Sequence, residues 1–190
     1  MTNSQFLKEI LILLTIILLV TSSYGQQQRQ VSRGHQNSYV DSAIFYFNKS
    51  KTANGIDSLV FAKGLKLMDS IPVDDNSFKR IQKTAEEFKN AEKIHYYSNI
   101  EQSLYSALIR TQQYYKAIDF GKEIVSRYEA TQNADERILF LDFLTVLRIP
   151  FRVSDKLEDG FDYYTSKLKL YLQKNDSAAI SICYFVNGGF

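Results

Sequence analysis

The segment Tyr97–Gly121 reads YSNIEQSLYSALIRTQQYYKAIDFG and decides the fold. Its first half carries large apolar side chains at steps of three and four, namely Tyr97, Ile100, Leu104 and Leu108. That spacing keeps apolar side chains on one face of an α-helix, whereas a half-buried strand needs alternation with a period of two. We therefore expect a helix over residues 93–110 and a second helix, after a short turn, over 114–130.

Similar stripes occur on both sides of this segment. One consists of Phe78, Ile81, Ala85 and Phe88, and another of Leu157, Phe161, Tyr164, Leu168 and Tyr171. The chain has only 8 Gly and 2 Pro in 190 residues, too few for the closely spaced turns of a β-sandwich or barrel. The sequence predicts an all-α fold with helices at 38–54, 56–71, 76–91, 93–110, 114–130, 134–148, 155–174 and 176–190.

Local signals mark several of these boundaries. Asn54-Gly55 tolerates a left-handed conformation and is expected to end the first helix, and Pro72 to stop the second. Two pairs have the spacing of an N-cap residue and an acidic residue three positions later: Asn133 with Glu136, and Asp155 with Glu158. Because the connections are short, successive helices should form antiparallel hairpins that stack into a curved α-solenoid.

The central hairpin resembles a tetratricopeptide repeat. In that family a Leu and a small residue on the first helix face an aromatic residue and an Ala on the second. Leu104, Leu108, Tyr114 and Ala117 match the pattern, whereas Tyr105 stands where a small residue is usual. The spacing of weaker echoes elsewhere is irregular, so the resemblance implies TPR-like repeats over most of residues 38–190 with one well-matched unit.

The N-terminus has the pattern of an export signal. Lys8 precedes an apolar run from Ile10 to Val20, and small residues follow up to Gly25. We expect a signal peptide over 1–25, cleaved before Gln26; the alternative is a retained membrane anchor, for which the run is short. Residues 26–37 are polar and are expected to be a flexible leader. No Cys precedes Cys183, which argues against lipid attachment after a signal.

The sequence offers little for catalysis, for a metal or for a cofactor. His35, His95 and Cys183 are the only His and Cys residues, too few for the usual metal-ligand patterns. Cys183 lies in an apolar run and is expected to be buried. The formal net charge is +2 and the charges are scattered, so no basic field for nucleic acid is expected. We predict no catalytic, cofactor-binding or metal-binding residues.

A partner is expected to bind on the concave face of the solenoid. By the same resemblance, the first helices of the hairpins line the concave face, where Gln102, Ser106 and Arg110 are predicted to contact a protein or peptide. An export signal together with irregular repeats resembles the extracytoplasmic sensor regions of bacterial two-component histidine kinases. That family continues into a membrane helix and a signalling domain, and the chain reaches Phe190 within a helical pattern, so we expect a fragment.

Two functional hypotheses follow. The first is a non-enzymatic, helical-repeat sensor or docking region of an exported signalling protein, on the periplasmic or extracellular side, with membrane contact only through the signal segment or a missing downstream span. The second is a free-standing secreted or periplasmic scaffold. A glycan-binding protein is disfavoured because the chain has no Trp and no lipid-attachment Cys.

Overall fold

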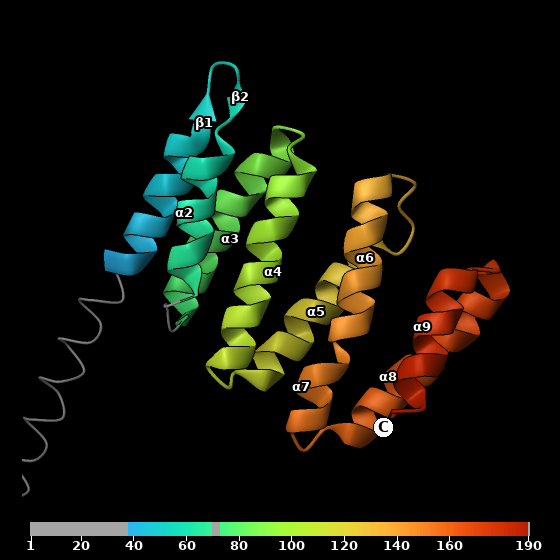
Figure 1. The fold of residues 1–190 in the computed structure, drawn as a ribbon. Coiled ribbons are helices and arrows are strands. Elements are labelled where there is room, and N and C mark those ends of the chain that lie inside the picture. The colour runs from blue at the N-terminus through green and yellow to red at the C-terminus, as the bar shows by residue number, and fades with distance from the viewer. Residues whose placement is uncertain (1–37, 70–72, 190) are drawn as a thin grey trace, which may run out of the picture.

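The computed structural model describes residues 38–69 and 73–189, and most of them are helical (Figure 1). A helix over 38–50 leads into a small hairpin and a series of further helices. These elements are β1 (Lys51–Thr52), β2 (Gly55–Ile56), α2 (Ser58–Met68), α3 (Asp75–Asn90), α4 (Ile94–Arg110), α5 (Tyr114–Tyr128), α6 (Ala134–Val146), α7 (Arg148–Val153), α8 (Leu157–Lys174) and α9 (Ser177–Asn187). The predicted helical class is confirmed apart from the β1–β2 hairpin.

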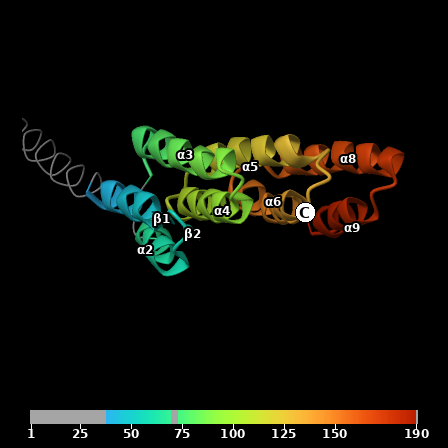
Figure 2. The same cartoon turned by 90° about the horizontal axis from the view of Figure 1, so that it is seen from above.

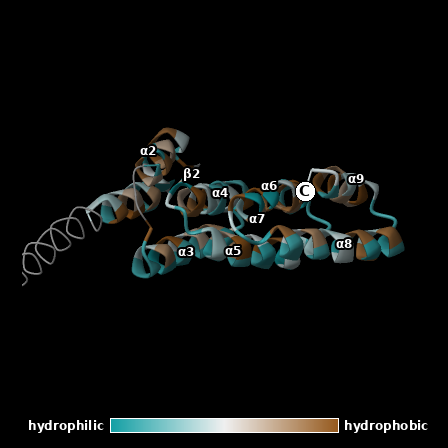
Figure 3. Cartoon of the chain, turned by 90° about the horizontal axis from the view of Figure 1, so that it is seen from below, coloured by the Kyte–Doolittle hydropathy of each residue, from teal (hydrophilic) through white to brown (hydrophobic). Residues whose placement is uncertain are grey.

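Most of the helices form two layers (Figure 2). One layer contains α3, α5 and α8, and the other contains α4, α6 and α9. Contacts join α3 to α4, α5 to α6 and α8 to α9, while α4 also packs on α5 and α6. Hydrophilic residues predominate along the outward edge of the α3–α5–α8 layer (Figure 3). The core therefore lies between the layers, as expected for amphipathic helices.

Two of the turns between helices have the same construction. Glu92 and Gln112 both have a φ of 59°, in the left-handed region. The amide of the following residue then donates back to the last turn of the preceding helix, from Lys93 to Phe88 O at 2.8 Å and from Gln113 to Leu108 O at 2.9 Å. These are the hydrogen bonds of a Schellman motif, formed here without glycine. They turn the chain sharply and set α3, α4 and α5 side by side.

The predicted apolar stripes were correct for two helices and partly wrong for a third. Every member of the Phe78 stripe in α3 and of the Tyr97 stripe in α4 is buried. In α8, Tyr164 and Tyr171 are buried, but Leu157 and Phe161 are 45% and 48% exposed. The later part of α8 is covered, because Tyr171 packs edge-on against Phe140 of α6 at a ring separation of 5.9 Å. The first turn of α8 is not covered to the same degree.

The first predicted helix is shorter than expected. It ends at residue 50, and Asn54-Gly55 does not form a helix cap: Asn54 lies in the turn of the β1–β2 hairpin and Gly55 begins β2, paired with Thr52. Gly55 has a φ of 128°, which side-chain-bearing residues rarely adopt, so the signal for a left-handed residue was correct but its context was not. The next helix begins at Ser58 behind the N-cap Asp57 and ends at Met68. Pro72 lies outside the described residues, as do the predicted signal peptide (1–25) and leader (26–37).

One of the two predicted N-caps is present. The side chain of Asn133 accepts hydrogen bonds from the amides of Asp135 and Glu136 at 3.0 and 3.1 Å. The prediction for Asp155 was wrong, because α8 starts at Leu157 and its N-cap Lys156 makes no side-chain capping bond. The Asp155 carboxylate accepts instead from the hydroxyl of Tyr115 in α5.

A break after α6 was not expected. Pro150 has no N–H to donate to the carbonyl of Val146, four residues earlier, and its ring disfavours a continuous helix at that point. The chain breaks at Leu147 and α7 follows as a short separate helix. The hydroxyl of Tyr105 in α4 donates to Val146 O at 3.1 Å, and that of Tyr164 in α8 donates to Leu144 O at 2.6 Å. Two tyrosines from neighbouring helices thus satisfy carbonyls at the break.

Candidate partner-binding cleft

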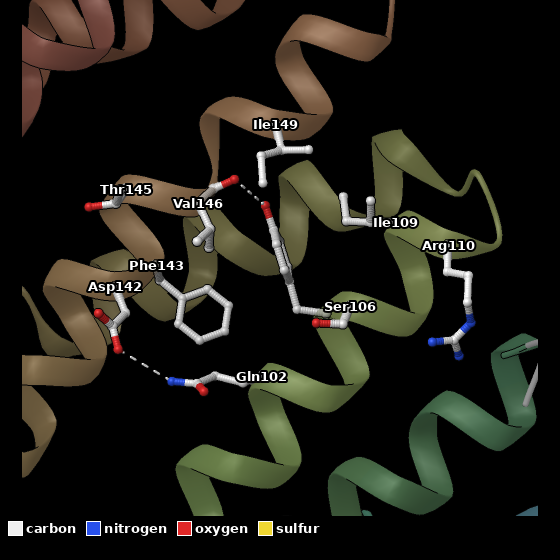
Figure 4. A pocket seen from close by; sticks show the side chains of 10 residues that line it. Gln102, Ser106, Ile109, Arg110, Asp142, Phe143, Thr145, Val146 and Ile149 are labelled. Carbon is white, nitrogen blue, oxygen red and sulfur yellow. Dashed lines mark hydrogen bonds between the residues drawn. The ribbon is translucent and has the colours of Figure 1, made fainter. Parts of the chain in front are cut away.

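A cleft with a volume of about 460 Å³ lies between α4 and the α6–α7 segment (Figure 4). A volume of this size suits a few side chains of a partner. Its lining from α4 consists of Gln102, Tyr105, Ser106, Ile109 and Arg110, and its lining from α6 and α7 consists of Asp142, Phe143, Thr145, Val146 and Ile149.

The polar rim of the cleft on the α4 side follows from helical spacing. Gln102, Ser106 and Arg110 recur every four residues, so they share one face of α4. Leu104 and Leu108 lie on the other side of the helix and are fully buried. The structure therefore brings together all three residues that the sequence predicted for partner contact, and places them in one cleft.

The apolar part of the cleft combines buried and accessible groups. Tyr105 is 4% exposed and Phe143 is 1% exposed, and their rings meet edge to face at 5.2 Å. Ile149 is 41% exposed and stands above them, because the break before Pro150 redirects the chain into α7 (Figure 4). The aromatic rings thus form a floor with little accessible face, and an aliphatic side chain forms part of the wall.

Tyr105 fits its position because of a glycine on the next helix. A Cβ atom placed on Gly121 of α5 would come within 3.2 Å of Tyr105 Cε2 and 2.7 Å of Leu147 Cδ1. The absence of a side chain at Gly121 therefore leaves the room that the Tyr105 ring and the Leu147 side chain occupy. This room explains how the large Tyr105 side chain fits where the sequence analysis expected a small residue.

Opposite charges stand on opposite sides of the cleft. The guanidinium of Arg110 donates to Met68 O at the end of α2, at 2.9 Å. Asp142 on α6 faces the amide of Gln102, whose Nε2 lies 3.5 Å from Asp142 Oδ2. Partial burial raises the pKa of the Asp142 carboxyl, because desolvation disfavours its charged form. Among the described residues Asp142 forms no ion pair.

The α6–α7 half of the cleft was missed from the sequence. Asp142 and Thr145 lie three residues apart on one face of α6, and Ile149 follows the break in α7, but α6 is also apolar on its other sides. A pattern of that kind does not single out one exposed face. Pro150 is the signal that predicts the break and the redirection of Ile149.

A second polar cluster links α4 to α5 through hydrogen bonds and ion pairs and does not form a cleft. Glu101 of α4 is 2% exposed and accepts hydrogen bonds from Tyr97 Oη at 2.5 Å and from Arg127 Nη1 of α5 at 2.8 Å. Its second oxygen, Oε2, is buried without a hydrogen-bond partner in the part of the chain that the structure describes. Burial raises the pKa of the Glu101 carboxyl. Arg127 also pairs with Glu86 and Glu123, so three carboxylates share one guanidinium.

Other candidate groups from the sequence do not converge. His95 lies exposed in the first turn of α4, and Cys183 is fully buried in α9, where burial raises its pKa to about 12. Within residues 38–69 and 73–189, no group of three or more His, Cys, Asp or Glu side chains is placed to hold a metal ion. Over the same residues, no helix is long and apolar enough to span a bilayer.

Comparisons with protein-family models, with curated proteins and with solved structures find no significant match to this chain.

Proposed function

We propose that this chain is the partner-binding, non-enzymatic helical-repeat region of an exported signalling protein, and that it binds a protein segment in the α4–α6 cleft. The observation that carries the proposal is the composition of that cleft, in which an apolar floor and wall are edged by polar side chains from two helices. Specific protein interfaces have this organisation, with a desolvated apolar centre and a hydrogen-bonding rim.

The packing of α4 on α5 supports a TPR-like solenoid as the architecture. Leu104, Leu108 and Ala117 are each fully buried, as the repeat pattern requires of positions where two helices approach closely. In a solenoid of this kind α4 and α6 are first helices of successive hairpins, and the cleft lies on their shared concave side.

The cleft favours protein over the other ligand classes. Among the described residues that line the cleft, Arg110 is the one cation and Asp142 opposes it, so a polyphosphate chain would meet as much repulsion as attraction. A sugar-stacking platform needs open aromatic faces, but Tyr105 and Phe143 are almost entirely buried. Gln102, Ser106 and Thr145 carry the mixed donors and acceptors that pair with a peptide backbone.

Binding in this cleft can change how the hairpins of the fold pack on one another. The two walls of the cleft are joined by the hydrogen bond from Tyr105 to Val146. An occupant that shifts α6–α7 against α4 changes the angle between successive hairpins, and each hairpin packs on the next. In a sensor this change in curvature would pass along the solenoid to the signalling domain.

Selection from a random peptide library displayed on phage tests the proposal. Peptides recovered on the purified chain are measured against Ser106→Trp, which fills the cleft from an exposed position, and against the control Asp119→Trp on the exposed side of α5. We expect Ser106→Trp to weaken binding at least tenfold and Asp119→Trp to leave it unchanged. Equal affinity for all three proteins would refute the cleft as the binding site.

A further inference from the structure

Arg110 and Asp142 lie at opposite sides of the cleft, with the apolar floor between them (Figure 4). Asp142 faces Gln102, and Gln102 and Arg110 are two turns apart along α4. At 1.5 Å per residue, those two turns span about 12 Å. The cleft therefore presents a negative and a positive group at a defined separation.

We propose that the occupant is an extended protein segment that carries a Lys or Arg side chain against Asp142, an acidic side chain toward Arg110, and an aliphatic side chain between them. This inference rests on the proposed function of the same cleft. It specifies the chemistry of the partner and the spacing of its residues.

The spacing follows from strand geometry. An extended chain rises about 3.3 Å per residue, so four residues cover about 13 Å, close to the rise along α4 from Gln102, which Asp142 faces, to Arg110. Residues i, i+2 and i+4 of an extended chain also point to the same side. A basic residue, an aliphatic residue and an acidic residue at alternate positions therefore face the cleft together, in an order set by the direction of binding.

Asp142 is the stronger of the two determinants. Its carboxylate is partly desolvated, and its polar contact with Gln102 is a long one to a neutral amide at 3.5 Å. Within the described ranges no cation pairs with it, although ion pairs form at many other carboxylates of the chain. A partner cation placed there would offset the desolvation of both charges with one direct contact.

Arg110 supplies the opposite charge from a fixed position. Its hydrogen bond to Met68 O holds the guanidinium near the end of α2, while the group keeps its positive charge. An acidic side chain of the occupant gains attraction there without displacing this bond. Peptides with two acidic residues would be repelled by Asp142, so the bipolar charge pattern provides specificity as well as affinity.

The aliphatic side chain of the proposed segment would contact apolar side chains of the cleft. Ile109, Val146 and Ile149 line the cleft between the charged sides (Figure 4). A Leu side chain packed against them removes apolar area from water, which favours binding. A Ser at the same peptide position would lose that contribution and keep both charges.

Titration of isotope-labelled protein with synthetic peptides, followed by NMR, tests the proposal. The core Lys-Ser-Leu-Ser-Glu, its reversed order Glu-Ser-Leu-Ser-Lys and an all-acidic core Glu-Ser-Leu-Ser-Glu are each flanked by Gly-Ser pairs. We expect at least one bipolar peptide to shift the Ser106 amide and to bind at least fivefold more tightly than the all-acidic peptide. Charge reversal by Asp142→Lys should invert that preference.

The outcomes separate the two proposals. Equal affinity of bipolar and all-acidic peptides, or no inversion with Asp142→Lys, would overturn the charge pattern. If library-selected peptides still depend on Ser106, the cleft remains the binding site and only the charge pattern fails. If Ser106→Trp affects neither set of peptides, both proposals fail.

Discussion

The hydroxyl of Tyr105 donates a 3.1 Å hydrogen bond to the carbonyl oxygen of Val146, the carbonyl to which Pro150 cannot donate. This hydrogen bond therefore replaces the donor that the helix break removes and joins α4 to α6. The ring of the same tyrosine forms part of the floor of the cleft. The ring is 4% exposed, so solvent has little access to replace the bond if it is lost.

We expect Tyr105→Phe to lower the free energy of unfolding by about 1–2 kcal/mol, because the partly buried Val146 carbonyl loses its donor. Urea denaturation measures the change. The matched control is Tyr115→Phe, which removes a hydroxyl from a residue that is 56% exposed and should change stability by no more than about 0.5 kcal/mol.

A double-mutant cycle isolates the role of the proline. Pro150→Ala returns an N–H group that can donate to Val146 O, so Tyr105→Phe should cost less in that background than in the wild type. Equal costs in both backgrounds would mean that the hydroxyl stabilises the protein by some route other than the free carbonyl.

The Glu101 cluster predicts a pH dependence. The folded-state pKa of Glu101 is raised above its ordinary value of 4.5 by burial, so folding binds a proton that the unfolded chain releases earlier. The stabilisation associated with that proton is fully present below about pH 4.5 and is lost as the pH rises through the folded-state pKa. We expect the unfolding free energy of the wild type, relative to Glu101→Gln, to fall over this range.

Denaturation curves at a series of pH values measure this difference. Glu123→Gln is the control, because Glu123 pairs with the same Arg127 but its side chain is 57% exposed. Its difference from the wild type should change little with pH. If the wild type instead gains stability over Glu101→Gln as the pH rises, Arg127 outweighs desolvation and the direction of the Glu101 pKa shift is reversed.

The α4 residues that the sequence analysis named line the cleft, whereas the α6 residues were missed for a physical reason. In α4, buried Leu104 and Leu108 define the inner face, which leaves Ser106 and Arg110 on the outer one. In α6, apolar residues occur on several sides, and only the packing of α4, α5 and α9 around the helix decides which of them is covered. Periodicity reports a face only where the other faces are polar.

The boundaries of the helices were less predictable from the sequence than their buried faces. Asn54-Gly55 signals a left-handed residue, but a helix cap and a hairpin turn both use one, and the choice depends on whether strand partners are available. Glu92 and Gln112 carry no such signal, since their left-handed conformations are imposed by the turns that pack α3, α4 and α5. The exposure of Leu157 and Phe161 likewise depends on neighbours that their own sequence does not specify.

Overpacking at Ala117 tests the α4–α5 register. Ala117 is fully buried in α5, so Ala117→Trp must displace neighbouring helices, and we expect a loss of at least about 1–3 kcal/mol in unfolding free energy. Thermal melts compare it with Ala62→Trp, which places the same side chain on an exposed position of α2, and with His95→Ala. A melting temperature for Ala117→Trp equal to that of the wild type would show that the packing of α5 is misplaced.

The turn between α3 and α4 provides a prediction of increased stability. Glu92 has a φ of 59°, a conformation that costs a residue with a Cβ about 1 kcal/mol or more and costs glycine almost nothing. Glycine also raises the entropy of the unfolded chain, which offsets part of the gain. We expect Glu92→Gly to raise the unfolding free energy by about 0.5 kcal/mol, measured by urea denaturation.

The control is the adjacent Lys93→Gly, because Lys93 has a φ of −97° and makes no side-chain capping bond. Glycine there relieves no strain and should lower stability. Gln112→Gly, in the equivalent turn before α5, should behave as Glu92→Gly does, and the two gains should add because the backbone hydrogen bonds of the two turns involve different residues. A loss of stability in Glu92→Gly as large as that in Lys93→Gly would mean that the α3–α4 turn does not hold a left-handed residue in solution.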